Sequence, residues 1–531
     1  MKDTDKYLIL ILLCAFTVRL HEIGFGIPYF VSPDESYYLP KALEMLSNLN
    51  FNPGHFKNPP LLKYIYAAAS CVYFAIWKAA SVFVNLPDFR ILWEENPLSF
   101  YYMARGMAAI FGVSTCYLLY LAGTRLFNKT VGLISSALLA FSFLHARDSH
   151  YAVNDVPALF FMTLAFYYLI KVFLEWKDKD AMLAGIFSGM AVATKYNMGI
   201  ILVSFFAVYL VRYRQGEKQS WFVKPLIYIA SCALSFFICC PWILLDAARF
   251  FGDFMWQFSL SKTGWWWRSP ESSYLQLLKT LLWGYGAVPF VLSIAGGAAL
   301  LMKKRQVFMV LWSFQLAYYV LLGASKLFFV RIAIPLLPFL CLSSAYGLWL
   351  ILDRYYKGHK AIACALLLLA VLQGMIFTIQ YNVLIGRVDR RVAAREWIWN
   401  NIPSGSRIVA EGYSPRLRDF AQDREPRSYD VKDVWADLSK HGVSEYRSEG
   451  YRYIVTSDFM RARYESDSSR YPEESSFYEG LDKSCKMAYS SDMPDSDASF
   501  AVDDIYSPFW NIFKLHVPGP RIRVYDIGTP R

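Results

Sequence analysis

Eleven apolar runs dominate the hydrophobic pattern of the first 385 residues. Each run is long enough, or nearly long enough, to cross a bilayer as a helix, which takes about 20 residues. The runs cover residues 7–23, 101–123, 131–147, 155–174, 181–194, 197–212, 224–245, 276–302, 307–323, 329–353 and 361–383. This pattern predicts a polytopic α-helical membrane protein with about eleven transmembrane helices.

A further apolar run at 60–85 differs from the others because it carries Lys63 and Lys78 among many aromatic residues. Such a pattern is typical of a helix that lies in the membrane interface. We therefore expect this run not to cross the bilayer. The alternative is a true span, which would reverse the sidedness of every later loop.

Composition agrees with a membrane protein. Of the 531 residues, 56% are hydrophobic and 18% are aromatic, which is too apolar for a soluble chain of this length. The formal charge of +11 could indicate nucleic-acid binding, but its placement in short loops favours membrane orientation, and we expect no nucleic-acid partner. Eight of the nine cysteines lie in or beside apolar runs, and only Cys485 lies in the polar tail, so the spacing predicts no disulfide framework.

Basic residues in the short loops give the orientation. Five loops carry them: Arg125 and Lys129; Lys177 and Lys179; Arg212, Arg214, Lys218 and Lys224; Lys303, Lys304 and Arg305; and Arg354, Lys357 and Lys360. With eleven spans, all five loops fall on the side of the N-terminus, which the positive-inside rule makes cytoplasmic. We expect a multi-pass plasma membrane protein, of the inner membrane in a bacterium, whose active site and tail lie on the extracytoplasmic side.

From about residue 386 the composition becomes polar. A helix-like stretch at 392–398 precedes strand-like stretches at 406–410, 451–456 and 522–527. The sequence therefore predicts a transmembrane domain over 1–385, with a first outer loop at 24–100, and a soluble extracytoplasmic α/β domain over 386–531. Residues 463–500 are rich in Ser, Asp and Glu, and we expect a mobile loop there.

Two adjacent carboxylates, Asp34 and Glu35, follow the first apolar run. A carboxylate pair beside a bilayer is costly to desolvate, so it is tolerated mainly where water, a partner or a substrate meets it. We interpret Asp34 as the centre of a catalytic cavity. The alternative is a solvated loop that caps the next helix.

Other polar residues gather on the same predicted outer face. They are Arg19, Arg105, His145, Arg147, Asp148, His150, Asp155, Lys195, Lys326 and Arg331. Carboxylates and cations together suit sugar transfer from a lipid phosphate, which needs a base for the acceptor's proton and positive charge for the departing phosphate. Asp34 fits the base, and Lys195, Arg331 and Lys326 fit the phosphate site. For each cation the alternative is an anchoring role at the interface.

The loop at 246–275 contains many aromatic residues, including Trp256 and Trp265-Trp266-Trp267. Rings of this density suit the headgroup layer. The loop is predicted to form a groove for a lipid-linked substrate, or an ordinary aromatic belt.

The order of these features resembles the GT-C membrane glycosyltransferases, and more narrowly the protein O-mannosyltransferase and lipid A aminoarabinose transferase group. The matching pieces are Arg19 with Asp34-Glu35-Ser36-Tyr37-Tyr38, Lys57-Asn58-Pro59-Pro60-Leu61, Arg147 to Asp155, Ala193-Thr194-Lys195-Tyr196, Pro241-Trp242, and Arg331 to Pro338. The usual Lys-Pro-Pro pattern is off by one residue at Lys57. The acid of the oligosaccharyltransferase Trp-Trp-Asp signature is missing after Trp265-Trp266-Trp267.

The resemblance implies an inverting transfer from a polyprenyl-phosphate sugar to an extracytoplasmic protein, lipid or glycan. It carries the base over to Asp34, assisted by Glu35, and the second acid to Asp155 or Asp148. It makes Lys195 a donor-phosphate contact, which we expect Arg331, Lys326 and Arg19 to share. Tyr37, Tyr38, Arg147, Asp148 and His150 are expected to line the cavity or the acceptor site.

No metal or other cofactor is expected to be required. Glu35, His55, His145 and His150 are compatible with a divalent metal, but no pair has a diagnostic ligand spacing, and Lys and Arg alone can stabilise a phosphate. A lipid or glycan transporter is the alternative function, although it would place charges along the middle of several spans. A scaffold that binds partners through its tail is a second alternative, which the set of Asp34, Asp155, Lys195 and Arg331 disfavours.

Overall fold

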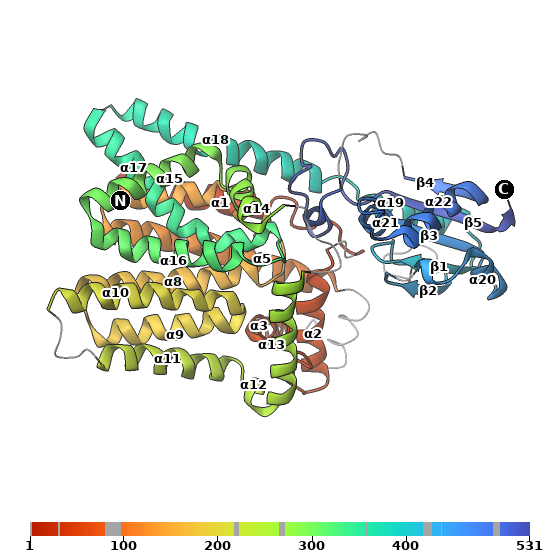
Figure 1. Ribbon diagram of the computed structural model, residues 1–531, viewed down its shortest axis with the longest axis horizontal. Helices are drawn as coiled ribbons and strands as arrows, with labels where there is room; N and C mark the ends of the chain where they lie inside the picture. The colour runs from red at the N-terminus through yellow and green to blue at the C-terminus, as the bar shows by residue number, and fades with distance from the viewer. Residues whose placement is uncertain are drawn as a thin grey trace. The chain divides into compact units, whose positions relative to one another are not determined.

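The computed structural model describes residues 3–29, 32–79, 97–216, 222–264, 271–355, 359–417, 427–436, 438–491 and 500–530. The chain divides into two compact units. Unit 1 comprises Met1–Ile23, Tyr38–Ala75 and Met103–Ile379, and unit 2 comprises Gly24–Tyr37, Ile76–Tyr102 and Gln380–Arg531. Unit 1 is helical, and unit 2 contains the β-sheet (Figure 1).

All eleven predicted runs are helical. They correspond to α1 (Asp3–Leu20), α5 (Leu98–Leu126), α6 with α7 (Lys129–Ala140, Phe143–Asp148), α8 (Asp155–Glu175), α9 (Asp178–Thr194), η1 with α10 (Tyr196–Ile201, Leu202–Arg214), α11 with α12 (Val223–Cys239, Trp242–Leu245), α14 with α15 (Ser273–Gly284, Ala287–Lys303), α16 (Arg305–Gly323), η2 with α17 (Val330–Leu336, Leu337–Tyr355) and α18 (Lys360–Ile385). Within the described residues, six helices are long and apolar enough to cross a membrane, and a seventh span results if α14 and α15, bent by 113°, count as one. The number of eleven spans stays a prediction.

Basic loops that are distant in sequence meet at one end of unit 1. Arg125 pairs with Glu175, Lys177 lies 2.5 Å from the same carboxylate, and Lys224 pairs with Asp178. The Arg212 guanidinium lies 5.6 Å from the centre of the Trp176 ring. Because α8 runs from Asp155 to Glu175, a rise of about 30 Å, Asp155 lies at the opposite end. Three of the five basic loops predicted to share one side therefore share one end of the helices.

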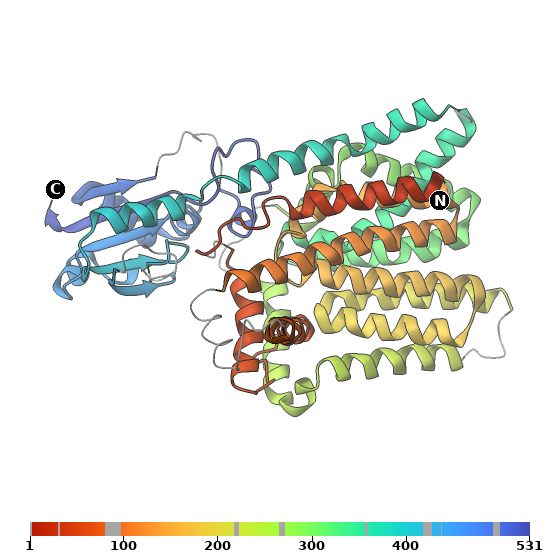
Figure 2. The same cartoon turned by 180° about the vertical axis from the view of Figure 1, so that it is seen from behind.

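The interfacial elements cross the direction of the long helices. Figure 2 shows α3 (Leu61–Ala79) nearly end-on, whereas α5 and α8 lie across the picture and are seen from the side. The segment between α2 (Glu35–Ser47) and α3 is attached to α13 (Ala247–Thr263), since the backbone N–H of Phe56 donates to Asp253 at 2.6 Å. The backbone oxygen of Lys57 accepts from Gln257 at 2.8 Å. The interfacial position of the run at 60–85 stays a prediction, and its residues 80–85 lie outside the described residues.

Unit 2 is built on a five-stranded sheet with the order β2-β1-β3-β5-β4. The strands are β1 (Arg407–Glu411), β2 (Asp430–Val434), β3 (Tyr453–Ser457), β4 (Cys485–Ser490) and β5 (Ile522–Pro530). β1 pairs in parallel with β2 and β3, and β5 pairs antiparallel with β3 and β4. The three strands predicted from the sequence are β1, β3 and β5.

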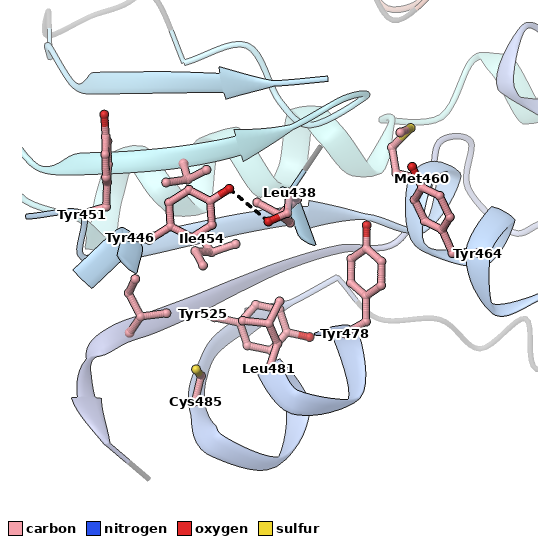
Figure 3. Close-up of a cluster of buried hydrophobic side chains, with 12 residues drawn as sticks. Leu438, Tyr446, Tyr451, Ile454, Met460, Tyr464, Tyr478, Leu481, Cys485 and Tyr525 are labelled. Atoms are coloured by element: carbon pink, nitrogen blue, oxygen red, sulfur yellow. Dashed lines mark hydrogen bonds between the residues drawn. The ribbon is translucent and has the colours of Figure 1, made fainter. Parts of the chain in front are cut away.

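The strand alternation fills two cores. Side chains point to opposite faces along a strand, so Val409 and Ile454 enter one cluster while Ile408 and Val455 enter the other. Helix α19 (Arg390–Asn401) covers the second face through Ala394, Ile398 and Ile402. The first cluster, drawn in Figure 3, is rich in tyrosine and receives α21 (Asp458–Glu465) and α22 (Pro472–Ser484).

The prediction of a mobile loop at 463–500 is wrong, because much of this stretch forms regular secondary structure. Residues 472–484 form α22 and residues 485–490 form β4. Tyr478 and Leu481 are buried beneath a polar outer face. Their burial favours the helix although the local composition is polar. Residues 492–499 of this prediction lie outside the described residues.

Candidate active site

An ion pair joins the start of α8 to the end of α9. The Lys195 ammonium donates to Asp155, and their side chains are 18% and 5% exposed. The amide of Asn154, which precedes α8, donates to the backbone oxygen of Thr194 at 2.9 Å. Asp155 opens its helix, where the helix dipole favours a carboxylate. Two residues 40 positions apart, both predicted as site residues, are therefore brought together.

Tyr318 connects two 3-10 segments, one next to Lys195 and one that contains Arg331. Its hydroxyl accepts from the Asn197 amide in η1 at 2.8 Å and donates to the backbone oxygen of Ile332 in η2 at 2.8 Å. η1 directly follows Lys195, and η2 contains Arg331. Pro335 lacks a backbone N–H, which is consistent with the absence of a regular α-helix there. Sequence reasoning missed Tyr318 and Asn197, because a tyrosine in an apolar span gives no signal of its own.

Arg147 and Asp148 form a second buried pair at the same end. Arg147 Nε and Nη2 donate to the two oxygens of Asp148, each at 3.0 Å. Burial raises the pKa of Asp148, and the Arg147 guanidinium opposes that rise. The charges of Asp155 and Arg331 also act on this carboxyl, so the four groups share one neighbourhood.

This end of unit 1 has the charge balance of an anion site. Arg147, Lys195 and Arg331 bring three positive charges, and Asp148 and Asp155 bring two carboxylates. One net positive charge in a mostly buried place is attractive for a phosphodiester, whose charge is minus one.

Arg19 is placed differently from its predicted role. It is fully buried, and its guanidinium donates to the backbone oxygens of Ala15 and Ala140 at 2.9 and 3.0 Å, to Ser149 at 3.2 Å and to a His145 ring nitrogen at 2.8 Å. These contacts join α1 to α6 and α7. The geometry favours a structural role over contact with a donor phosphate.

His150 is likewise surrounded by backbone. Its Nδ1 lies 2.9 Å from the oxygen of Ala146, and its Nε2 lies 3.2 Å from the oxygen of His21. Burial lowers its pKa to about 4. His150 joins α1 to α7 and does not present a ring nitrogen to a cavity.

Asp34 and Glu35 belong to unit 2, whereas Asp155 and Lys195 belong to unit 1, so the proposed base and the cations do not share one compact unit. Asp34 is half-buried and directly precedes α2. Glu35 opens α2 with 2% exposure, which places it in packing and not in open water.

Of the two tyrosines in this motif, Tyr37 is half-buried and Tyr38 is 4% exposed. Lys326 is exposed, and its backbone N–H donates to Ser261 at the end of α13 at 2.7 Å. The aromatic stretch predicted as a loop at 246–275 is helical over residues 247–263, which form α13. In this helix the Trp256 ring lies 4.2 Å from the Lys57 ammonium. Trp265-Trp266-Trp267 lie outside the described residues.

The histidines proposed for a metal are engaged otherwise. His55 Nδ1 lies 3.5 Å from the Lys63 ammonium, His145 contacts Arg19, and His150 contacts backbone oxygens. Cations beside His55 and His145 oppose binding of a metal ion. In the part of the chain that the structure describes, the grouping with suitable ligand spacing is His441, Glu445 and Glu449 near α20 (Val443–Ser448). Lys432 already pairs with Glu449 at 2.8 Å there.

The fold places the chain in a class. Over 98% of its length it superposes on 88% of the oligosaccharyltransferase of Archaeoglobus fulgidus in the apo form, with a TM-score of 0.58 and 13% identity. The same enzyme in complex with an inhibitory peptide and a dolichol-phosphate matches 99% of this chain and 88% of that chain, with a TM-score of 0.57 and 14% identity. The chain thus has the GT-C fold of membrane glycosyltransferases, as the sequence resemblance implied.

Sequence comparison points the same way for part of the chain. Residues 102–245 match the dolichyl-phosphate-mannose-protein mannosyltransferase family. An uncharacterized protein of Aquifex aeolicus is 26% identical over 231 residues. That match spans 42% of this chain and 41% of the relative, so the chain covers less than half of the relative's length.

Proposed function

We propose that this protein is an inverting glycosyltransferase that moves a sugar from a polyprenyl-phosphate donor to an extracytoplasmic acceptor. The observation that carries the proposal is the Asp155–Lys195 pair beside Arg147, Asp148 and Arg331 at one end of unit 1. The family match over residues 102–245 and the dolichol-phosphate bound by the archaeal neighbour support this donor class.

The reaction is a single displacement in which protons and charges balance. The acceptor oxygen attacks the anomeric carbon, and its proton passes to the Asp34 carboxylate. The bond from that carbon to the phosphate oxygen breaks, and polyprenyl phosphate leaves with the added negative charge. Lys195 and Arg331 stabilise this charge, and Asp155 positions the Lys195 ammonium.

The proposed steps require no metal, and a divalent metal is compatible with them. The Archaeoglobus enzyme has also been solved in complex with zinc and sulfate. In this chain the ring nitrogens of His145 and His150 already contact Arg19 and backbone oxygens, so these residues do not fit a metal at the proposed site.

The proposal is tested by sugar transfer from a defined polyprenyl-phosphate donor with purified protein. Lys195→Ala and Arg331→Ala should each lower kcat/KM for the donor by about 10²-fold, the order expected for losing one transition-state charge contact. Because Lys195→Ala also leaves Asp155 unpaired, Lys195→Ala with Asp155→Asn serves as a second variant.

Lys303→Ala is the matched control, since Lys303 is exposed at the end of α15. Its transfer rate should equal that of the wild type. Equal losses in all three single variants, or no transfer by the wild-type protein from any polyprenyl-phosphate sugar, would contradict the proposed phosphate site.

A further inference from the structure

The order of strands in the sheet of unit 2 reverses at β1, and a crevice lies at this point. The chain runs from β1 to β2 on one side of β1, and then crosses to β3 on the other side. Such a switch point, at the carboxyl ends of parallel strands, is where ligands bind in open α/β sheets. Here the segment after β1 and the end of β2 line a cavity of about 690 Å³.

A second cavity of about 190 Å³ shares the wall formed by Tyr413 to Arg416 and Trp435. Its remaining lining comes from Arg391 and Arg395 on α19 and from Tyr29, Pro33 and Ser36 of the first outer loop, all within unit 2. We call the two neighbouring cavities together the sheet-end crevice.

Arginines outnumber carboxylates in the lining of the crevice. The charged residues are Arg391, Arg395, Arg416, Arg427, Glu411 and Asp433. The Arg395 guanidinium lies 4.2 Å from the Trp399 ring and 5.0 Å from the Tyr29 ring, and its Nε donates to the backbone oxygen of Arg416 at 3.1 Å. The Arg416 side chain is exposed. Guanidinium groups held in this way recognise carboxylate and phosphate groups.

Aromatic residues are also part of the lining. The Tyr413 and Trp435 ring centroids are 4.8 Å apart, and Trp435 is 59% exposed. A Cβ at Gly412 would meet the backbone oxygen of Trp435 at 2.6 Å, so glycine is required to hold Trp435 this close to β1. An exposed, fixed indole is a platform for the apolar face of a sugar ring.

Tyr413 is held in a strained conformation, with φ of +63°. Such backbone costs free energy for a non-glycine residue and is found preferentially at ligand sites. Its hydroxyl accepts from Arg463 at 2.9 Å, which fixes the ring. Burial raises the pKa of Tyr413, and the Asp34 carboxylate adds to that rise, so Asp34 is close to this wall.

We propose that the sheet-end crevice is the acceptor site and that the acceptor is an anionic carbohydrate, with its acidic group on Arg395 and Arg416, its ring on Trp435 and a hydroxyl toward Asp34. This inference rests on the proposed function, because the bound carbohydrate is an acceptor only if the protein is a glycosyltransferase. The binding itself is independent of the donor, which separates the two tests.

The experiment is calorimetric titration of the full-length protein in nanodiscs, without donor. The probes are a uronic-acid trisaccharide, a phosphorylated trisaccharide and a neutral trisaccharide. At least one acidic probe should bind ten times more tightly than the neutral probe, and the difference should shrink in high salt. The two acidic probes distinguish a carboxylate from a phosphate.

Arg416→Ala and Trp435→Ala should each weaken binding of the acidic probe about tenfold. Both side chains are exposed, so the fold should survive, which thermal unfolding verifies. Arg470→Ala removes an exposed arginine of the same unit and should bind like the wild type. Equal binding of neutral and acidic probes, no binding by the wild type, or equal affinity in Trp435→Ala and Arg470→Ala would overturn the proposal.

Donor hydrolysis in the absence of acceptor gives an independent measurement. Arg470→Ala, which lies outside the crevice lining, should hydrolyse a polyprenyl-phosphate sugar at the wild-type rate. A wild-type protein that binds the acidic probe but uses no such donor would contradict the proposed function and leave the binding site standing.

Discussion

Asp34 and Asp155 were both predicted as site carboxylates, but their surroundings suit different roles. Asp155 pairs with Lys195, so its carboxylate is already engaged by a cation. Asp34 lies between Pro33 and Ser36, which line the sheet-end crevice. The assignment of the base to Asp34 is therefore retained as our proposal.

Asp34→Asn keeps the size and one acceptor oxygen but cannot take a proton. If Asp34 deprotonates the acceptor, kcat should fall by about 10²- to 10⁴-fold, the usual contribution of a positioned base. Protein level should be unchanged, because an amide is cheaper to desolvate than a carboxylate. Sugar transfer by purified protein measures this. A variant with near-normal transfer would move the base to Asp155 or Asp148.

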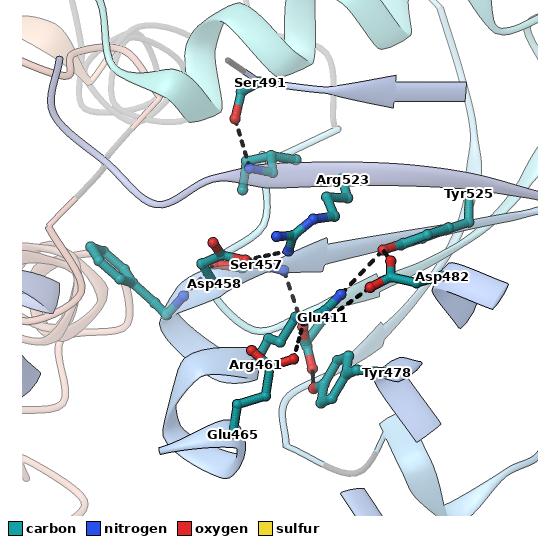
Figure 4. Close-up of polar contacts among 12 residues, drawn as sticks. Glu411, Ser457, Asp458, Arg461, Glu465, Tyr478, Asp482, Ser491, Arg523 and Tyr525 are labelled. Atoms are coloured by element: carbon teal, nitrogen blue, oxygen red, sulfur yellow. Dashed lines mark hydrogen bonds and ion pairs between the residues drawn. The ribbon is translucent and has the colours of Figure 1, made fainter. Parts of the chain in front are cut away.

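The buried carboxyl of Glu411 should make the stability of unit 2 depend on pH. Burial raises its pKa from 4.5 to about 8, against hydrogen bonds from Tyr478 and from the backbone N–H of Ser457 (Figure 4). The folded state keeps the proton between these two pH values while the unfolded state loses it. The stability of unit 2 is therefore fully present below pH 4.5 and falls by about 1.4 kcal/mol per pH unit as pH rises toward 8.

Glu411→Gln should remove this pH dependence. The glutamine amide can donate to Tyr478 while its oxygen accepts from Ser457, as the protonated carboxyl does. Thermal unfolding of both proteins from pH 5 to 8 checks this expectation. Parallel losses of Tm in the two proteins would show that another group is responsible.

At the scale of elements, small residues set the distance between α9 and α11. A Cβ at Gly185 would meet the backbone oxygen of Tyr228 at 2.4 Å, and one at Gly189 would meet that of Cys232 at 2.3 Å. Glycines spaced by four residues let membrane helices approach closely. This packing holds the end of α9, from which Lys195 extends.

Gly189→Leu should therefore separate α9 from α11 and cost about 1–3 kcal/mol, the usual range for overpacking. Thermal unfolding in detergent measures the loss, which should appear as a lower Tm. Gly199→Leu is the control, because a Cβ there makes only an ordinary contact of 3.6 Å with Val192. Equal destabilisation by both substitutions would contradict the packing argument.

At the scale of the whole molecule, sidedness follows from the basic loops. Residues 390–531 are predicted to be extracytoplasmic, and the loop after α10 cytoplasmic. With the exposed Cys71 and Cys364 replaced by serine, Ser469→Cys should react with an impermeant maleimide in intact cells, and Gln215→Cys only after lysis. The reverse pattern would mean that 60–85 crosses the membrane or that the number of spans is even.

Hydrophobic periodicity by itself determined the eleven apolar helical runs and three strands of unit 2, because burial in lipid or in a core imposes runs and alternation on neighbouring residues. It missed α2 and α13. It also identified Asp155 and Lys195 as unusual charges. Only the tertiary structure paired them, since residues 40 positions apart meet through the packing of α8 on α9. Only the tertiary structure placed Tyr318 beside the two 3-10 segments and buried Arg19 among backbone oxygens. It also made a polar stretch helical as α22. These outcomes depend on long-range contacts that leave no local pattern in the sequence.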